Sequence, residues 1–119
     1  ILMFCKKTKA IAAVHSGWRG TISGVIENTI SLLEEHQVNA QDIETYIMPS
    51  IQQASYEVSE DVYNEFTSKD QAFKEFFIVN NPEKPSFLFN LPSAAKYILN
   101  RHGIYNINHD NRDTYADKM

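Results

Sequence analysis

Hydrophobic and polar positions along the chain change between short apolar runs and longer amphipathic stretches. Residues 1–5 and 10–14 are apolar runs of strand length, and the polar residues 6–9 between them predict a β-hairpin. Residues 21–36 carry apolar side chains at spacings of three and four, the pattern of one amphipathic helix. We therefore expect the chain to open with a hairpin followed by a helix.

The same alternation continues to the end of the chain. Ser59 can begin a helix that runs to about Ser68, and Asn90 can cap another that ends at Gly103, a residue suited to a left-handed terminus. Strands are expected at 44–48, 76–79, 86–89 and 104–107, and the strand at 76–79 is expected to be buried. Strands and helices alternate without internal repeats, so the predicted class is mixed α and β in a single domain over 1–119.

Composition and charge exclude several classes of protein. The chain has 119 residues with a net charge of −4, which argues against a nucleic-acid partner. One cysteine excludes a disulfide scaffold, and no apolar run approaches the roughly 20 residues of a membrane span. We expect a cytoplasmic protein without a membrane partner. The chain opens at Ile1 inside an apolar run and ends at Met119 after a strand-like segment, so we expect both ends to be truncations.

Residues 12–21 carry the clearest chemistry, because an apolar strand there leads through two glycines into the expected helix. Gly17 and Gly20 are expected to adopt positive φ and to let a ligand approach the backbone, while the helix start after Gly20 offers unpaired N–H groups to an anion. Arg19 adds a planar fork of donors suited to phosphate or carboxylate. A plain tight turn with Arg19 in solvent explains the same residues.

His15 ends the second apolar run and has three interpretations: a core histidine, a general base or a metal ligand. A Cys5/His15 catalytic pair fails a geometric test, because Cys5 should pair near Ala10. His15 then lies five residues further along the strand, roughly 17 Å at about 3.4 Å per residue. The residue opposite His15 would precede Ile1, and we expect a second ligand or nucleophile there.

Three blocks of sequence resemble the laccase-domain family, also called the multicopper polyphenol oxidase or YfiH family. The first block is similar to the family's His-Ala-Gly-Trp-Arg-Gly between a strand and a helix, and the others follow in the family's order. The blocks here are His15-Ser16-Gly17-Trp18-Arg19-Gly20, then Met48-Pro49-Ser50-Ile51 with Tyr56-Glu57-Val58, then Asn90-Leu91 with Gly103-Ile104. The chain resembles about the second half of a family member.

This resemblance implies a layered α+β sandwich of mixed sheets flanked by helices, and a zinc-dependent purine nucleoside phosphorylase. Adenosine and phosphate would be the substrates, with deamination of adenosine as a related activity. His15 would be a metal ligand and Arg19 a catalytic residue that stabilises the anionic nucleophile. Gly17, Gly20, Ser50 and Tyr56 would bind substrate. The family's remaining zinc ligands, a His and a Cys, are not matched here, so the site in this chain would be incomplete and the chain alone inactive.

Several positions depart from the family's pattern, and other functions stay open. Met48 replaces a glycine, Asn90 replaces an aspartate, and residues 53–55 stand where the family often has cysteines. The alternatives are a Cys/His hydrolase that edits peptidoglycan precursors, a copper polyphenol oxidase and a non-catalytic fragment. Copper ranks below zinc because one histidine without a matched cysteine cannot hold several copper ions. A chain separated from its first half would expose apolar surface and self-associate.

Overall fold

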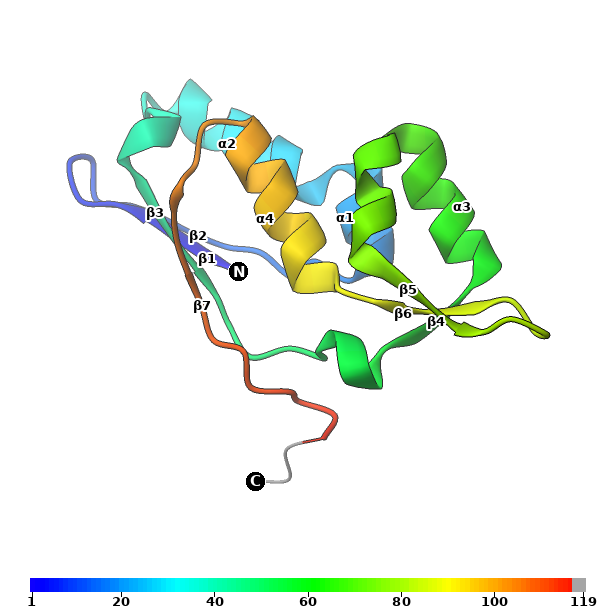
Figure 1. The fold of residues 1–119 in the computed structure, drawn as a ribbon. Coiled ribbons are helices and arrows are strands. Elements are labelled where there is room, and N and C mark those ends of the chain that lie inside the picture. The colour runs from blue at the N-terminus through cyan, green and yellow to red at the C-terminus, as the bar shows by residue number, and fades with distance from the viewer. Residues whose placement is uncertain (117–119) are drawn as a thin grey trace. The chain divides into compact units, whose positions relative to one another are not determined.

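The computed structural model describes residues 1–116, which fall into two compact units (Figure 1). The first unit comprises residues 1–48 and 95–110, and the second comprises residues 49–94 and the chain from Asn111 onward. Both units combine a sheet with helices, so the predicted α+β class is confirmed. Within residues 1–116, no helix has the length and apolar character needed to cross a membrane.

The first unit is a four-stranded sheet in the order β2-β1-β3-β7, with helices α1, α2 and most of α4. The predicted hairpin is confirmed, including the expected pairing of Cys5 with Ala10. Strand β1 pairs antiparallel with β2 and β3, and β7 runs parallel to β3. The elements are β1 (Leu2–Cys5), β2 (Ala10–Ala13), α1 (Trp18–Ser23), α2 (Val25–Glu35), β3 (Ile43–Ile47), α4 (Leu91–Arg101) and β7 (Asn106–His109).

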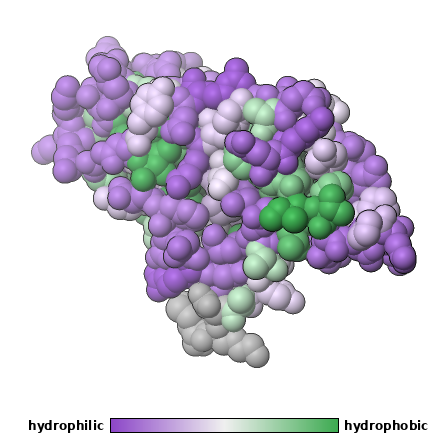
Figure 2. Space-filling view, in the orientation of Figure 1, coloured by the Kyte–Doolittle hydropathy of each residue, from purple (hydrophilic) through white to green (hydrophobic). Residues whose placement is uncertain are grey.

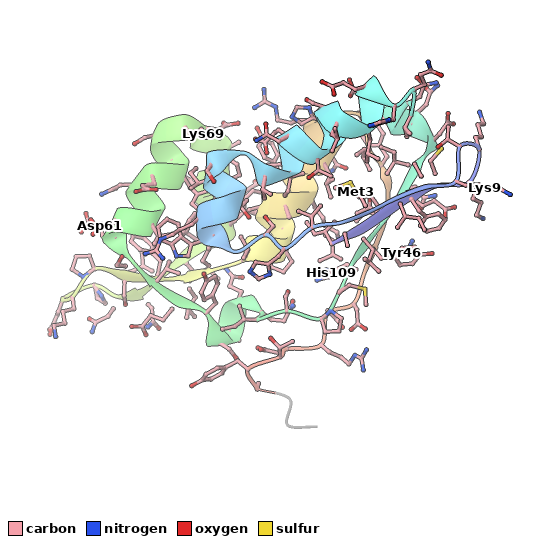
Figure 3. All side chains as sticks on the ribbon, turned by 180° about the vertical axis from the view of Figure 1, so that it is seen from behind. Met3, Lys9, Tyr46, Asp61, Lys69 and His109 are labelled. Atoms are coloured by element: carbon pink, nitrogen blue, oxygen red, sulfur yellow. The ribbon has the colours of Figure 1, made fainter. Side chains whose placement is uncertain are left out.

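The two faces of this sheet differ in burial, because side chains alternate along each strand. Met3 on β1 is 0% exposed and belongs to the core. On the opposite face Tyr46 is 39% exposed and Ile11 78% exposed, and the Phe4 ring stacks on Tyr46 at 5.9 Å between centroids. Figure 3 shows Met3 and Tyr46 on opposite sides of the strands. The second face is therefore an apolar surface that no helix of the unit covers.

The single helix expected over 21–36 is wrong, because the structure contains two helices that meet at Gly24. The first begins at Trp18, before the expected start, and Gly24 between the two has φ of 100°. The apolar spacing continues across this break, which hides it from a periodicity argument. Glycine adopts this left-handed conformation without the steric cost that a Cβ would add, so the chain turns between α1 and α2 at that residue.

The second unit is a three-stranded antiparallel sheet in the order β4-β6-β5, with α3 packed on it. Its core is a group of stacked and edge-on aromatic rings that includes Phe66, Phe77 and Phe89. The predicted helix and strand starts are close to those found, but the strand expected at 76–79 is exposed beyond Phe77. The elements are β4 (Glu57–Ser59), α3 (Glu60–Lys69), β5 (Phe77–Asn81) and β6 (Ser86–Phe89).

Exposure of β5 has a simple cause: β5 is an edge strand, and only Phe77 reaches the aromatic core. Ile78 and Val79 are 54% and 61% exposed. Figure 2 shows that apolar areas lie among largely hydrophilic residues on the face in view. Two predicted helix ends hold, since Asn90 accepts a hydrogen bond from the Ser93 N–H at 3.1 Å and Gly103 has φ of 85°. The last strand lies at 106–109 rather than 104–107, because the Ile104 N–H donates back to the Leu99 carbonyl oxygen of α4 at 3.0 Å.

Candidate functional site

His15 stands directly after the last pair of residues in the β1/β2 hairpin. The Val14 N–H donates to the Ile1 carbonyl oxygen at 2.8 Å, and the Ile1 amino group donates to the Val14 carbonyl oxygen at 2.9 Å. The His15 side chain is exposed and forms no hydrogen bond or ion pair with residues 1–116. A buried core role for His15 is therefore wrong, and its imidazole is accessible to a ligand.

The two glycines of the segment act differently from the expectation of positive φ, which is wrong for both. Gly17 precedes α1 in an extended conformation with φ of −73°, and a Cβ there would meet no atom within 4 Å. Gly20 lies inside α1, where a Cβ would stand 3.4 Å from Val25 Cγ1 and 3.8 Å from the His15 carbonyl oxygen. A side chain at Gly20 would therefore make ordinary contacts with Val25 and the end of β2, and Gly17 leaves open space at its own Cβ position.

Thr21 fixes the shape of this segment by hydrogen bonds within it. Its hydroxyl donates to the Gly17 carbonyl oxygen at 2.7 Å, and the Ser16 hydroxyl lies 2.5 Å from the same Thr21 oxygen. Thr21 is 1% exposed, and both bonds are partly buried. Because Thr21 Oγ1 uses its proton on Gly17, the Ser16 hydroxyl is the donor of the second bond. Sequence reasoning assigned Thr21 no such role, since only the turn after β2 brings these groups together.

Arg19 projects from the first turn of α1 next to the single tryptophan of the chain. Its guanidinium carbon lies 5.0 Å from the centroid of the Trp18 ring, in cation–π range. No carboxylate of residues 1–116 forms an ion pair with Arg19, and the side chain is exposed. The guanidinium donors therefore stay available to an anion, while the indole ring restricts where they point.

Ser50 and Tyr56 lie in the second unit, on the segment between β3 and β4. Ser50 pairs as an isolated parallel bridge with Asp113, and the Tyr56 ring stacks on Phe89 at 6.0 Å between centroids. Burial raises the pKa of the Tyr56 hydroxyl, which keeps it a neutral hydrogen-bonding group at neutral pH. The structure therefore groups His15, Gly17, Arg19 and Gly20 in one unit, and Ser50 with Tyr56 in the other.

The side chains available as metal ligands decide whether residues 1–116 can bind a metal ion. They contain no group of three or more His, Cys, Asp or Glu side chains that could hold a metal ion. Cys5, the single cysteine, is buried in the sheet and pairs with Ala10, away from the position of His15. The exposed His15 imidazole suits zinc as one ligand, but this part of the chain offers no complete zinc or copper site.

Asp113 is a second residue that sequence reasoning missed. Its carboxylate accepts the Tyr115 N–H at 2.9 Å and the Ala116 N–H at 3.3 Å. The nearby Ser55 side chain first, and these backbone N–H groups after it, hold the pKa of Asp113 below its ordinary value. An acidic residue in a polar stretch gives no sequence signal for the contact with Ser55, because the two residues lie far apart along the chain.

Comparison with known proteins defines the class of protein to which this fold and segment belong. The family described as multi-copper polyphenol oxidoreductase laccase matches residues 1–119, and the chain belongs to this family. A purine nucleoside phosphorylase of Rickettsia prowazekii is 34% identical over 98% of this chain and 48% of its own length. The purine nucleoside phosphorylase YfiH of Escherichia coli is 28% identical over 98% of this chain and 46% of its own.

Solved structures agree with the family assignment. A Neisseria meningitidis protein superposes with a TM-score of 0.85 at 29% identity, over 95% of this chain and 45% of its own. Bacillus licheniformis YfiH superposes with a TM-score of 0.84 at 19% identity, which supports the fold alone. The resemblance to the YfiH family is therefore confirmed. The chain spans about half the length of the curated relatives it matches.

Proposed function

We propose that the whole protein is a purine nucleoside phosphorylase, to which this chain contributes the His15–Gly20 segment and the loop that carries Ser50 and Tyr56. The observation that carries this proposal is the purine nucleoside phosphorylase name of curated relatives that match almost the entire chain. The exposed imidazole and guanidinium of His15 and Arg19 are compatible with it, because phosphorolysis needs groups that bind an anion.

Adenosine is the substrate that we propose, and its phosphorolysis yields adenine and ribose 1-phosphate. An oxygen of inorganic phosphate attacks C1′ of the ribose, the C1′–N9 bond breaks, and its electron pair leaves with the purine, which takes up a proton. Arg19 would bind two phosphate oxygens through its parallel N–H groups and hold the nucleophile. The stack of Arg19 on Trp18 limits the positions of the guanidinium, which reduces the entropy lost on binding.

His15 would hold a zinc ion together with ligands from outside residues 1–116. Zinc, when bound, supplies a Lewis acid that stabilises negative charge on oxygen. The residues of this chain do the remaining work in the proposal. Gly17 leaves open space at its own Cβ position, and the Thr21 hydroxyl keeps the turn in one conformation. Ser50 and Tyr56 would contact the nucleoside through their hydroxyl groups.

Product analysis tests the proposed reaction. The longest form of the protein that its gene encodes is incubated with adenosine, with and without inorganic phosphate, and the products are separated by chromatography. Adenine and ribose 1-phosphate that form only with phosphate support the proposal. Adenine formed equally without phosphate indicates a hydrolase, inosine with ammonia indicates deamination, and phenol oxidation without nucleoside turnover indicates an oxidase. Each of the last three outcomes as the main activity contradicts the phosphorylase proposal.

The chain provides a matched pair of arginines for the role of Arg19. Arg19 stacks on Trp18 at 5.0 Å, and Arg101 stacks on Tyr97 at 5.7 Å on α4. We expect Arg19→Gln to raise the KM for phosphate by about tenfold or more, the effect of losing a charge-assisted hydrogen bond. Arg101→Gln should leave that KM unchanged. Equal effects of the two substitutions would contradict a phosphate-binding role for Arg19.

A further inference from the structure

The loop at residues 50–56 carries both residues of the second unit that we assign to substrate binding. The part of the loop from Gln53 to Tyr56 is hydrogen bonded to the three-stranded sheet and the residues next to it. The Gln53 side-chain amide donates to the carbonyl oxygens of Phe76 at 3.3 Å and Leu88 at 3.2 Å. The Phe89 N–H donates to the Tyr56 carbonyl oxygen at 2.9 Å. The sheet therefore determines where Gln53 and Tyr56 lie.

The outer side of the loop is held by the segment around Asp113. The two segments run parallel at Ser50 and Asp113, and the Thr114 N–H donates to the Ser50 carbonyl oxygen at 3.1 Å. The Ser55 side chain and the Gln52 N–H also lie close enough to the Asp113 carboxylate to lower its pKa. The segment around Asp113 therefore lies beside the short helical turn formed by residues 53–55.

The same carboxylate also orders its own segment. Asp113 Oδ1 accepts the N–H groups of Tyr115 at 2.9 Å and Ala116 at 3.3 Å, which closes a turn. This turn contains the Thr114 N–H that donates to the Ser50 carbonyl oxygen, so the order of the turn bears on the pairing with the loop. An alanine at position 113 accepts neither bond that closes the turn, whereas an asparagine keeps a single acceptor oxygen.

Gln52 holds Ser50 from within the loop. The Gln52 side-chain amide donates to the Ser50 carbonyl oxygen at 3.1 Å and lies 3.3 Å from the Ser50 hydroxyl oxygen. The Ser50 carbonyl oxygen also accepts the Thr114 N–H, so Ser50 is held both from within its loop and from the Asp113 segment.

We propose that Asp113 is a positioning residue for nucleoside binding, whose carboxylate holds loop 50–56 in the conformation that presents Ser50 and Tyr56 to the substrate. This inference rests on the proposed phosphorylase function, because it assumes that the loop contacts the nucleoside. Asp113 itself touches no substrate in this proposal. Its effect is on the affinity of the site, through the fraction of molecules in which the loop is ordered.

Two readouts test the proposal, and the first needs no activity. Amide hydrogen exchange across residues 50–56 is measured for the 119-residue chain, for Asp113→Ala and Asp113→Asn, and for Asp70→Ala. Asp70 is the matched control, because its carboxylate also closes a turn in the same unit by accepting the Ala72 N–H at 2.9 Å. We expect Asp113→Ala to speed exchange in the loop by about tenfold, Asp113→Asn to have a smaller effect, and Asp70→Ala to have none there.

The second readout is the split between KM and kcat for adenosine in the longest encoded form. We expect Asp113→Ala to raise KM by about tenfold and to change kcat by less than about twofold, since the reacting groups are untouched. Faster exchange together with the higher KM supports the proposal. If the parent protein is active, the role of Asp113 is overturned by either of two results for Asp113→Ala: unchanged amide exchange in loop 50–56, or faster exchange there with an unchanged KM. If the parent protein does not catalyse phosphorolysis, the proposed function is overturned, and with it the role of Asp113 in substrate binding.

Discussion

Replacement of Thr21 by valine tests whether hydrogen bonds inside residues 15–21 hold the turn after β2. Valine keeps the β-branched shape of threonine and its rotamer preference, so packing changes little. The substitution removes the donor to the Gly17 carbonyl oxygen at 2.7 Å and the acceptor of the Ser16 hydroxyl at 2.5 Å. Gly17 stays satisfied, because its carbonyl oxygen also accepts the Thr21 N–H at 2.9 Å.

The expected loss in the free energy of unfolding follows from two opposing terms. Two partly buried hydrogen bonds contribute about 1 kcal/mol each, which gives a loss of about 2 kcal/mol. A buried methyl group in place of the hydroxyl returns about 0.8 kcal/mol. The net destabilisation is therefore about 1 kcal/mol, provided that the Ser16 hydroxyl, which is half-buried, turns to water.

Urea unfolding followed by tryptophan fluorescence measures this loss at the right place, since Trp18, within the same segment, is the single tryptophan. Ser23→Ala is the matched control, because the exposed Ser23 hydroxyl also donates to a helix carbonyl, that of Arg19 at 2.7 Å. We expect the control to change the free energy of unfolding by less than about 0.5 kcal/mol. A loss below about 0.3 kcal/mol for Thr21→Val, or equal losses for both variants, would refute the assigned role of Thr21.

Three further predictions follow from particular residues. Gly24→Ala should cost about 1–2 kcal/mol of unfolding free energy because φ is 100° there, whereas Gly17→Ala at φ of −73° should cost less than about 0.5 kcal/mol; similar costs in urea unfolding would contradict this difference. The folded-state pKa of Asp113 lies below the unfolded value of about 3.9, so its stabilisation is complete above that pH and is lost as pH falls through the folded pKa. Asp113→Asn should therefore lose less stability than the parent between pH 5 and pH 3 in acid titrations, and parallel curves would count against the shift. Ile11, 78% exposed on the open sheet face, should support self-association, so Ile11→Lys should lower the weight-average mass in ultracentrifugation more than Leu32→Lys on α2; a parent that is monomeric at all concentrations would exclude this.

The parts of the fold that the sequence predicted well are those set by local chemistry. Four polar residues between two apolar runs leave one register for the hairpin, so the pairing of Cys5 with Ala10 was predictable. Asn90 and Gly103 mark the ends of α4 because a capping side chain and a left-handed glycine act within a few residues. These interactions need no knowledge of the rest of the chain.

Other features depend on contacts that one sequence does not reveal. The break at Gly24 is invisible to apolar spacing, which continues from α1 into α2. Gly20 was expected to admit a ligand, but the position of its Cβ faces Val25 Cγ1 at 3.4 Å and the His15 carbonyl oxygen at 3.8 Å. The role of Asp113 depends on its pairing with Ser50, a residue far from it along the chain. Motif similarity identified His15 and Arg19 as candidate site residues. The roles of Thr21 and Asp113 became visible only in the structure.

The most direct test of the central claim is a comparison of His15→Ala with His36→Ala in the longest form of the protein that its gene encodes. Both histidines are exposed, and His36 lies at the end of α2. Phosphate-dependent release of adenine from adenosine is measured together with zinc content. The account predicts that His15→Ala loses both the activity and the zinc, while His36→Ala keeps both. Full activity and zinc in His15→Ala would contradict the assignment of this segment to the site.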